Sequence, residues 1–101
     1  MPAVFNATAS FSIPSRKAFV IAGDIASGVA KKGMMMKLRM NSSFAIELPI
    51  DSIEFIRKKE GSEVGLLTVC RDADELALLQ GLNIGKETIE IDDAPPDEHR
   101  G

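Results

Sequence analysis

The sequence is poor in the residues on which most active sites and cross-links depend. Its 101 residues include no Trp, no Tyr, one His and one Cys. Because Cys70 has no second cysteine to pair with, we expect a reducing, cytoplasmic environment. His99 follows a proline pair in a charged stretch, without the rigid support that a catalytic or metal-binding histidine needs. We therefore predict that the chain is not an enzyme and binds no metal and no cofactor.

Long apolar runs and phosphate-binding loops are missing as well. No apolar segment approaches the ~18 residues of a membrane-spanning helix. No segment matches G-x-x-x-x-G-K-[ST], the loop whose backbone amides hold nucleotide phosphates. We expect neither a membrane nor a nucleotide among the partners of this protein.

Charge is distributed unevenly along the chain. Residues 1–70 carry nine Lys or Arg and six Asp or Glu, a net charge of +3, whereas residues 71–101 carry three and nine, a net charge of −6. Nucleic-acid-binding domains are usually basic overall, and this chain is not. The distribution leaves room for a local basic patch in the first 70 residues.

What the sequence does contain is alternation of apolar and polar residues, the pattern of a half-buried β-strand. Apolar residues occupy every second position, with few exceptions, in four segments: Phe5 to Ile13, Phe19 to Ile25, Met34 to Met40, and Ile46 to Ile50. Residues 63–70 are almost continuously apolar, as in a strand covered on both faces, and residues 88–91 form a last strand. By alternation, Phe11, Phe19 and Phe55 are expected to face inward.

Turn residues separate these segments. Pro14-Ser15 ends the first, and Ser27-Gly28 with Gly33 connects the second to the third. The apolar phase then slips by one residue between Ile50 and Ile53, which predicts a bulge or bend between residues 49 and 52.

One short helix and a tail complete the predicted organisation. Residues 72–79, DADELALL, begin with Asp72 as a potential N-cap and Glu75 three residues later, and Gly81 can end the helix. Residues 92–101, DDAPPDEHRG, are predicted to be an acidic disordered tail, so that residues 1–91 form a single domain. The predicted fold is all-β: a closed, six- or seven-stranded antiparallel barrel with one short helix.

Five short stretches, taken in order, carry a resemblance to a known family. They are residues 11–13 (FSI), 23–29 (GDIASGV), 31–34 (KKGM), 53–55 (IEF) and 64–67 (VGLL). Together they resemble domain 2 of the translational GTPases, the β-barrel that follows the GTPase domain in elongation factor Tu and initiation factor 2. In that family this barrel packs on the GTPase domain and touches the ribosome, so the resemblance implies a docking function.

The basic residues that could contact a partner fall at expected turns and strand ends, where solvated charge is the ordinary alternative. They are Arg16, Lys17, Lys31, Lys32, Arg57, Lys58 and Lys59. In elongation factor Tu, the stretch that matches residues 53–58 places a glutamate against the terminal adenosine of transfer RNA. The resemblance therefore implies Glu54 and Arg57 as contacts for the acceptor end of transfer RNA.

Three functions stay open at this point, in a definite order. The leading hypothesis is a non-catalytic barrel that docks on a protein or ribonucleoprotein partner. The alternative is an RNA-binding module for the transfer RNA acceptor end, with weak affinity because the acidic segment 71–101 opposes phosphate binding. A small enzyme or an accessory subunit ranks last, since catalytic side chains are scarce.

Overall fold

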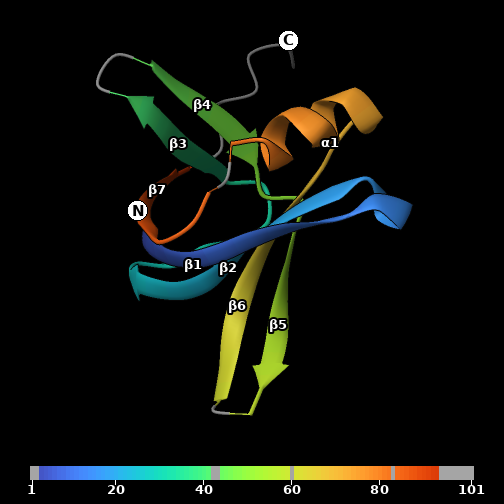
Figure 1. Ribbon diagram of the computed structural model, residues 1–101. Coiled ribbons are helices and arrows are strands. Elements are labelled where there is room, and N and C mark those ends of the chain that lie inside the picture. The colour runs from blue at the N-terminus through green and yellow to red at the C-terminus, as the bar shows by residue number, and fades with distance from the viewer. Residues whose placement is uncertain (1–2, 42–43, 60, 83, 94–101) are drawn as a thin grey trace, which may run out of the picture.

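The computed structural model describes residues 3–41, 44–59, 61–82 and 84–93, and for residues 39–41, 44 and 58 it describes the backbone alone. Within these residues the chain forms seven strands, one α-helix and one 3-10 turn (Figure 1). In chain order they are β1 (Ala3–Ile13), η1 (Pro14–Arg16), β2 (Ala18–Ser27), β3 (Met35–Asn41), β4 (Phe44–Pro49), β5 (Ser52–Lys58), β6 (Gly61–Val69), α1 (Ala73–Gln80) and β7 (Glu87–Asp92). The predicted predominance of β-strands with one short helix is confirmed. The predicted tail lies outside the described residues, apart from Asp92 at the end of β7 and Asp93.

The strands form one antiparallel sheet in the order β4-β3-β7-β1-β2-β6-β5. The sheet curves strongly, but in the described residues its edge strands β4 and β5 do not pair, so the predicted closed barrel is wrong. Only Ile50 and Asp51 connect these two strands. Ile50 N–H bonds to Met34 O at 2.8 Å, and Asp51 N–H bonds to Leu67 O at 2.7 Å. Because each N–H bonds to a different neighbouring segment, the chain crosses from one edge to the other and does not fold back as a hairpin.

The long strand β1 supplies much of the curvature. It pairs with β7 over Ala3 to Ala7 and with β2 over nearly its whole length, and its register with β2 shifts at two places. One shift falls between Ala7 and Ala9, opposite Gly23. A Cβ atom on Gly23 would overlap the carbonyl oxygen of Asn6, so only glycine allows this close approach of the two strands.

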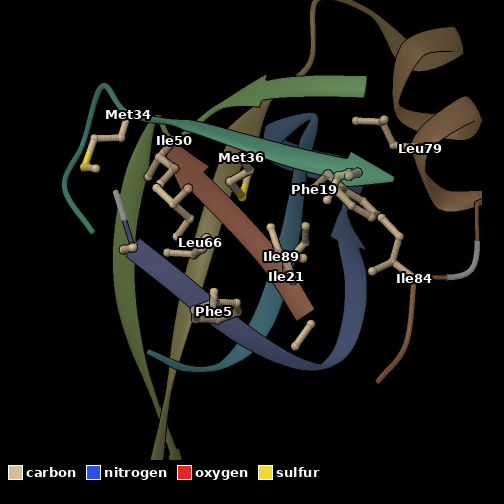
Figure 2. Packing of buried hydrophobic residues seen from close by; sticks show 14 of the residues in the cluster. Phe5, Phe19, Ile21, Met34, Met36, Ile50, Leu66, Leu79, Ile84 and Ile89 are labelled. Carbon is tan, nitrogen blue, oxygen red and sulfur yellow. The ribbon is translucent and has the colours of Figure 1, made fainter. Parts of the chain in front are cut away.

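The concave side of the sheet encloses the main core, and Figure 2 shows many of its side chains. Strand alternation predicted several of these residues: Phe5, Phe19, Ile21, Met34, Met36, Leu38 and Ile50 are all buried. Leu76 and Leu79 of α1 and Ile84 complete one side of the core. The side chain of Met40 lies outside the described residues.

The helix and turns agree with the sequence pattern. Asp72 caps α1, because its Oδ1 accepts from the N–H of Glu75 at 2.8 Å. Glu75 Oε1 in turn accepts from the N–H of Arg71 at 2.8 Å, one residue before the position of a standard capping box. Gly28 and Gly33 take positive φ angles of 79° and 96° in the β2–β3 connection. The predicted bend falls at Ile50 and Asp51, between β4 and β5.

Two of the three phenylalanines predicted to face inward are exposed, and so is Val69 in the strand predicted to be covered on both faces. Phe11 follows the register shift in β1, so it pairs with Val20 on the outer face and is 43% exposed. Phe55 pairs with Val64 on the core-facing side of β5, but it is 77% exposed. The reason is its position: β6 pairs with β2 only as far as Val64, and beyond that point β5 and β6 continue alone (Figure 1).

Candidate functional site

The β5–β6 hairpin projects from the sheet at the end of the molecule away from α1 (Figure 1). Its pairing runs from Ser52 with Leu67 to Lys58 with Gly61, and Gly61 takes a φ of 135° at the turn. Where the hairpin leaves the sheet, Thr8 Oγ1 of β1 donates a hydrogen bond to Glu63 Oε2 at 3.0 Å. The hairpin is therefore anchored at its base and has solvent around its end.

The exposed residues at the end of this hairpin are Phe55, Arg57, Lys59, Gly61 and Ser62, which we call the tip patch. Phe55 and Arg57 lie two residues apart in β5 and therefore share one face. A shallow hollow of about 410 Å³ is lined by the four patch residues other than Phe55, which are Arg57, Lys59, Gly61 and Ser62. The tip patch thus combines one exposed aromatic ring with two cations.

Glu54, the residue that the resemblance implies as a base contact, has a partner inside the molecule. Its Oε2 lies 3.3 Å from Nη2 of Arg16, with side chains 45% and 52% exposed. Ser52 Oγ also donates to the same oxygen, at 3.5 Å. An exposed pair of this kind is worth about 0–1 kcal/mol. In the sheet, β2 and β6 lie between η1 and β5, so the Arg16–Glu54 pair crosses the outer face of these strands. A second small core of Ala18, Val20 and Leu67 lies on this face.

The remaining predicted contacts do not join the tip patch. Lys17 has φ 50° at the β1–β2 turn, and its carbonyl accepts from the N–H of Cys70 at 2.7 Å. Lys31 and Lys32 are exposed in the β2–β3 connection, beside the start of β5, since Gly33 N–H bonds to Ile50 O at 2.8 Å. The hairpin tip is about 20–25 Å further along β5, at ~3.3 Å per residue. The predicted basic residues therefore lie in three separate regions of the surface and do not form one continuous patch. The backbone of Lys58 is in β5, and its side chain lies outside the described residues.

Chemically reactive groups are sparse in the part of the chain that the structure describes. Cys70 is buried, and this burial raises the pKa of its thiol, with the charges of Glu75, Asp72 and Asp51 adding to the effect. Among the described residues, no group of three His, Cys, Asp or Glu could hold a metal ion. His99 lies outside them.

A second hollow lies beside β1. It measures about 620 Å³ and is lined by Thr8, Ala9, Ser10, Phe11, Ser12, Phe19, Gln80, Ile84 and Gly85. None of these side chains titrates. All three of its hydroxyls are already used: Ser10 Oγ donates to Ile84 O at 2.7 Å, Ser12 Oγ donates to Gln80 Oε1 at 3.0 Å, and Thr8 Oγ1 donates to Glu63 Oε2 at 3.0 Å. This hollow therefore offers no acid, base or nucleophile other than hydroxyl groups held in structural bonds.

The chain was compared with family models, curated proteins and solved structures, and none of them matches it. The α-helix that the structure describes is too short to cross a membrane.

Sequence patterns missed three residues of the tip patch, Gly61, Ser62 and the exposed aromatic residue Phe55. The error that matters most is Phe55. Alternation correctly places it on the core-facing side of β5, but alternation carries no information on where the neighbouring strands end. The only available signal was its position, three residues before the charged run Lys58-Lys59-Glu60. A residue so close to a hairpin turn can lie beyond the sheet.

Proposed function

We propose that this protein is a non-catalytic β-sheet module that docks on a protein or ribonucleoprotein partner through the tip patch. The observation that carries the proposal is Phe55, which is 77% exposed on a projecting hairpin. Aromatic residues and arginine dominate the binding energy of many interfaces. Phe55 and Arg57 share one face of β5, so a single partner can contact both.

The resemblance to domain 2 of the translational GTPases makes the ribosome the first partner to test. In this proposal the module acts in the cytoplasm, where the free thiol of Cys70 would be stable. The sheet would be a variant of the translation-factor barrel in which β4 and β5 do not pair. What supports this reading is the ordered set of matching stretches, four of which lie on β1, β2, β5 and β6.

Co-sedimentation with purified ribosomes tests the proposal. We expect the unmodified protein to pellet with ribosomes and Phe55→Ala to bind about tenfold more weakly, as loss of a central aromatic contact predicts. Leu78→Ala is the matched control, because Leu78 is 62% exposed on α1, remote from the tip patch. Equal binding by Phe55→Ala and the unmodified protein would exclude the tip patch, and no pelleting at all would exclude the ribosome.

A second function, binding of the transfer RNA acceptor end, is favoured by one observation. Phe55 gives the surface on which a terminal base could stack, with Arg57 beside it for a phosphate. Against it, Glu54 is already paired with Arg16. We expect only weak binding when transfer RNA is titrated at physiological salt. Sub-micromolar affinity that is lost in Arg57→Ala would make RNA the primary ligand.

A further inference from the structure

Strand β5 forms one edge of the sheet along its full length. Its seven residues pair with β6 on one side, and no other described strand pairs with it on the other side. Such an edge presents backbone N–H and C=O groups at every second residue, and another extended polypeptide can pair with them. The opposite edge, β4, is shorter and ends in Pro49, which has no N–H to donate.

The exposed charge beside the β5 edge is positive. Arg57 and Lys59 are exposed, and no described carboxylate pairs with either of them. Glu54 is the one acidic residue of β5, and Arg16 already balances its charge at 3.3 Å. Edge cations ordinarily discourage pairing with another chain, because a strand without acidic side chains gives them no partner. A strand that carries carboxylates removes this obstacle.

The end of the hairpin has room for such carboxylates. The hollow of about 410 Å³ at the tip is lined by Arg57, Lys59, Gly61 and Ser62. Two cations and a hydroxyl group suit a carboxylate, because both of its oxygens accept hydrogen bonds and it carries a negative charge. Phe55 lies on the same face of β5 as Arg57 and is 77% exposed, so it offers an apolar contact to the same added strand.

We propose that the partner contributes an extended acidic segment, which pairs with the free edge of β5 and places its carboxylates against Arg57 and Lys59. The open edge selects a polypeptide, because RNA has no regular row of backbone N–H and C=O groups. The two cations select acidic side chains. This inference rests on the proposed function, since it names the part of the partner that the tip patch contacts.

A second open edge in the sheet lacks this charge. Beyond Ala7, no described strand pairs with β1 on the side of β7, and the hollow of about 620 Å³ lies there. Its lining residues are all uncharged, so nothing in this hollow selects an acidic segment. The acidic segment is therefore assigned to β5.

Fluorescence anisotropy with a labelled model peptide tests the proposal. The peptide alternates Thr, which favours strands, with Glu, and a second peptide has Lys in place of Glu. At low salt the Glu peptide should bind saturably and the Lys peptide should not. Arg57→Glu and Lys59→Glu should each weaken binding by about fivefold, since an attractive pair becomes a repulsive one. Lys86→Glu is the matched control, because Lys86 is exposed before β7, away from β5.

N-methylated peptides test whether the contact is strand pairing. In an extended chain the N–H groups of successive residues point to opposite edges, so only every second N–H of the peptide can face β5. Two versions of the Glu peptide carry N-methyl groups, one on every Thr and the other on every Glu. One version should lose binding and the other should keep it. Circular dichroism confirms that each protein variant is folded.

Four results would overturn the proposal. They are no saturable binding of the Glu peptide up to about 1 mM, equal binding of the Glu and Lys peptides, normal binding of both methylated versions, and equal binding by Arg57→Glu and the unmodified protein. Binding of a short single-stranded RNA that depends on Arg57, without binding of the peptide, would assign the cations to phosphate and also reject the acidic strand.

None of these measurements uses ribosomes, so the docking proposal and the acidic strand can fail separately. Weaker ribosome binding by Phe55→Ala without any peptide binding would support docking and reject the acidic strand. Peptide binding without co-sedimentation would support the acidic strand and exclude the ribosome as the partner.

Discussion

At the scale of single residues, Gly23 marks the point where the backbone leaves no room for a side chain. A Cβ atom there would overlap the Asn6 carbonyl oxygen and lie 2.9 Å from Ala7 Cα. We expect Gly23→Ala to lower the free energy of unfolding by about 2–4 kcal/mol, because β1 and β2 must move apart. Urea denaturation measures this change.

Gly85→Ala is the control for that substitution. No atom lies within 4 Å of a Cβ built at Gly85, so the change in stability should stay within about 0.5 kcal/mol. Similar losses in both variants would show that the close approach of β1 and β2 at Gly23 does not exist in solution.

Cys70 yields a prediction about pH. Burial, followed by the negative charges of Glu75, Asp72 and Asp51, raises the pKa of the thiol above its ordinary value. The native protein therefore holds less thiolate than the unfolded chain near neutral pH, and it should react more slowly with a thiol reagent than the same protein in urea. Equal rates in the two states would contradict this account.

The same shift has a consequence for stability. Because folding raises the pKa of the Cys70 thiol, protonation of this thiol favours the native state, and the effect is fully present at pH values below the pKa of the unfolded thiol. This contribution to the free energy of unfolding is lost as pH rises through the pKa of the native thiol. The protein should thus become less stable in the alkaline range, and Cys70→Ser should show a smaller alkaline loss.

At the scale of elements, the end of the β5–β6 hairpin is expected to contribute to partner binding and little to the stability of the fold. Phe55 is 77% exposed, so Phe55→Ala should change the free energy of unfolding by no more than about 0.5 kcal/mol. Phe19, which is 1% exposed in the main core, should lose about 3–5 kcal/mol on the same substitution. Denaturation of the two variants would check this, and a large loss for Phe55→Ala would mean that the hairpin folds back on the sheet.

Individual elements were predictable from sequence because they depend on local patterns. Alternation indicates the strands, and Asp72 with Gly81 bounds the helix to within one residue. The exposure of Phe11 could not be predicted, since a register shift opposite Gly23 reverses the faces of β1 from that point. The exposure of Phe55 depends on where β2 stops pairing with β6, which is a property of two distant strands.

At the scale of the whole molecule, the sequence pattern does not determine whether the sheet closes into a barrel or stays open. Alternation with a period of two says which face a residue occupies, but it does not say which strands become neighbours. Here the two N–H groups of Ile50 and Asp51 bond in different directions, so β4 and β5 stay apart. The free edge of β5 follows directly from this opening, and closure of the sheet by pairing of β4 with β5 would cover that edge.

The central claim, that the tip patch is the docking surface, can be tested by hydrogen exchange of the protein alone and bound to ribosomes. We predict slower exchange of backbone amides in residues 55–59 and 61–62 on binding, and unchanged exchange at Lys31 and Lys32. Slower exchange confined to residues 8–12, beside the large hollow, or to the β2–β3 connection would contradict the claim.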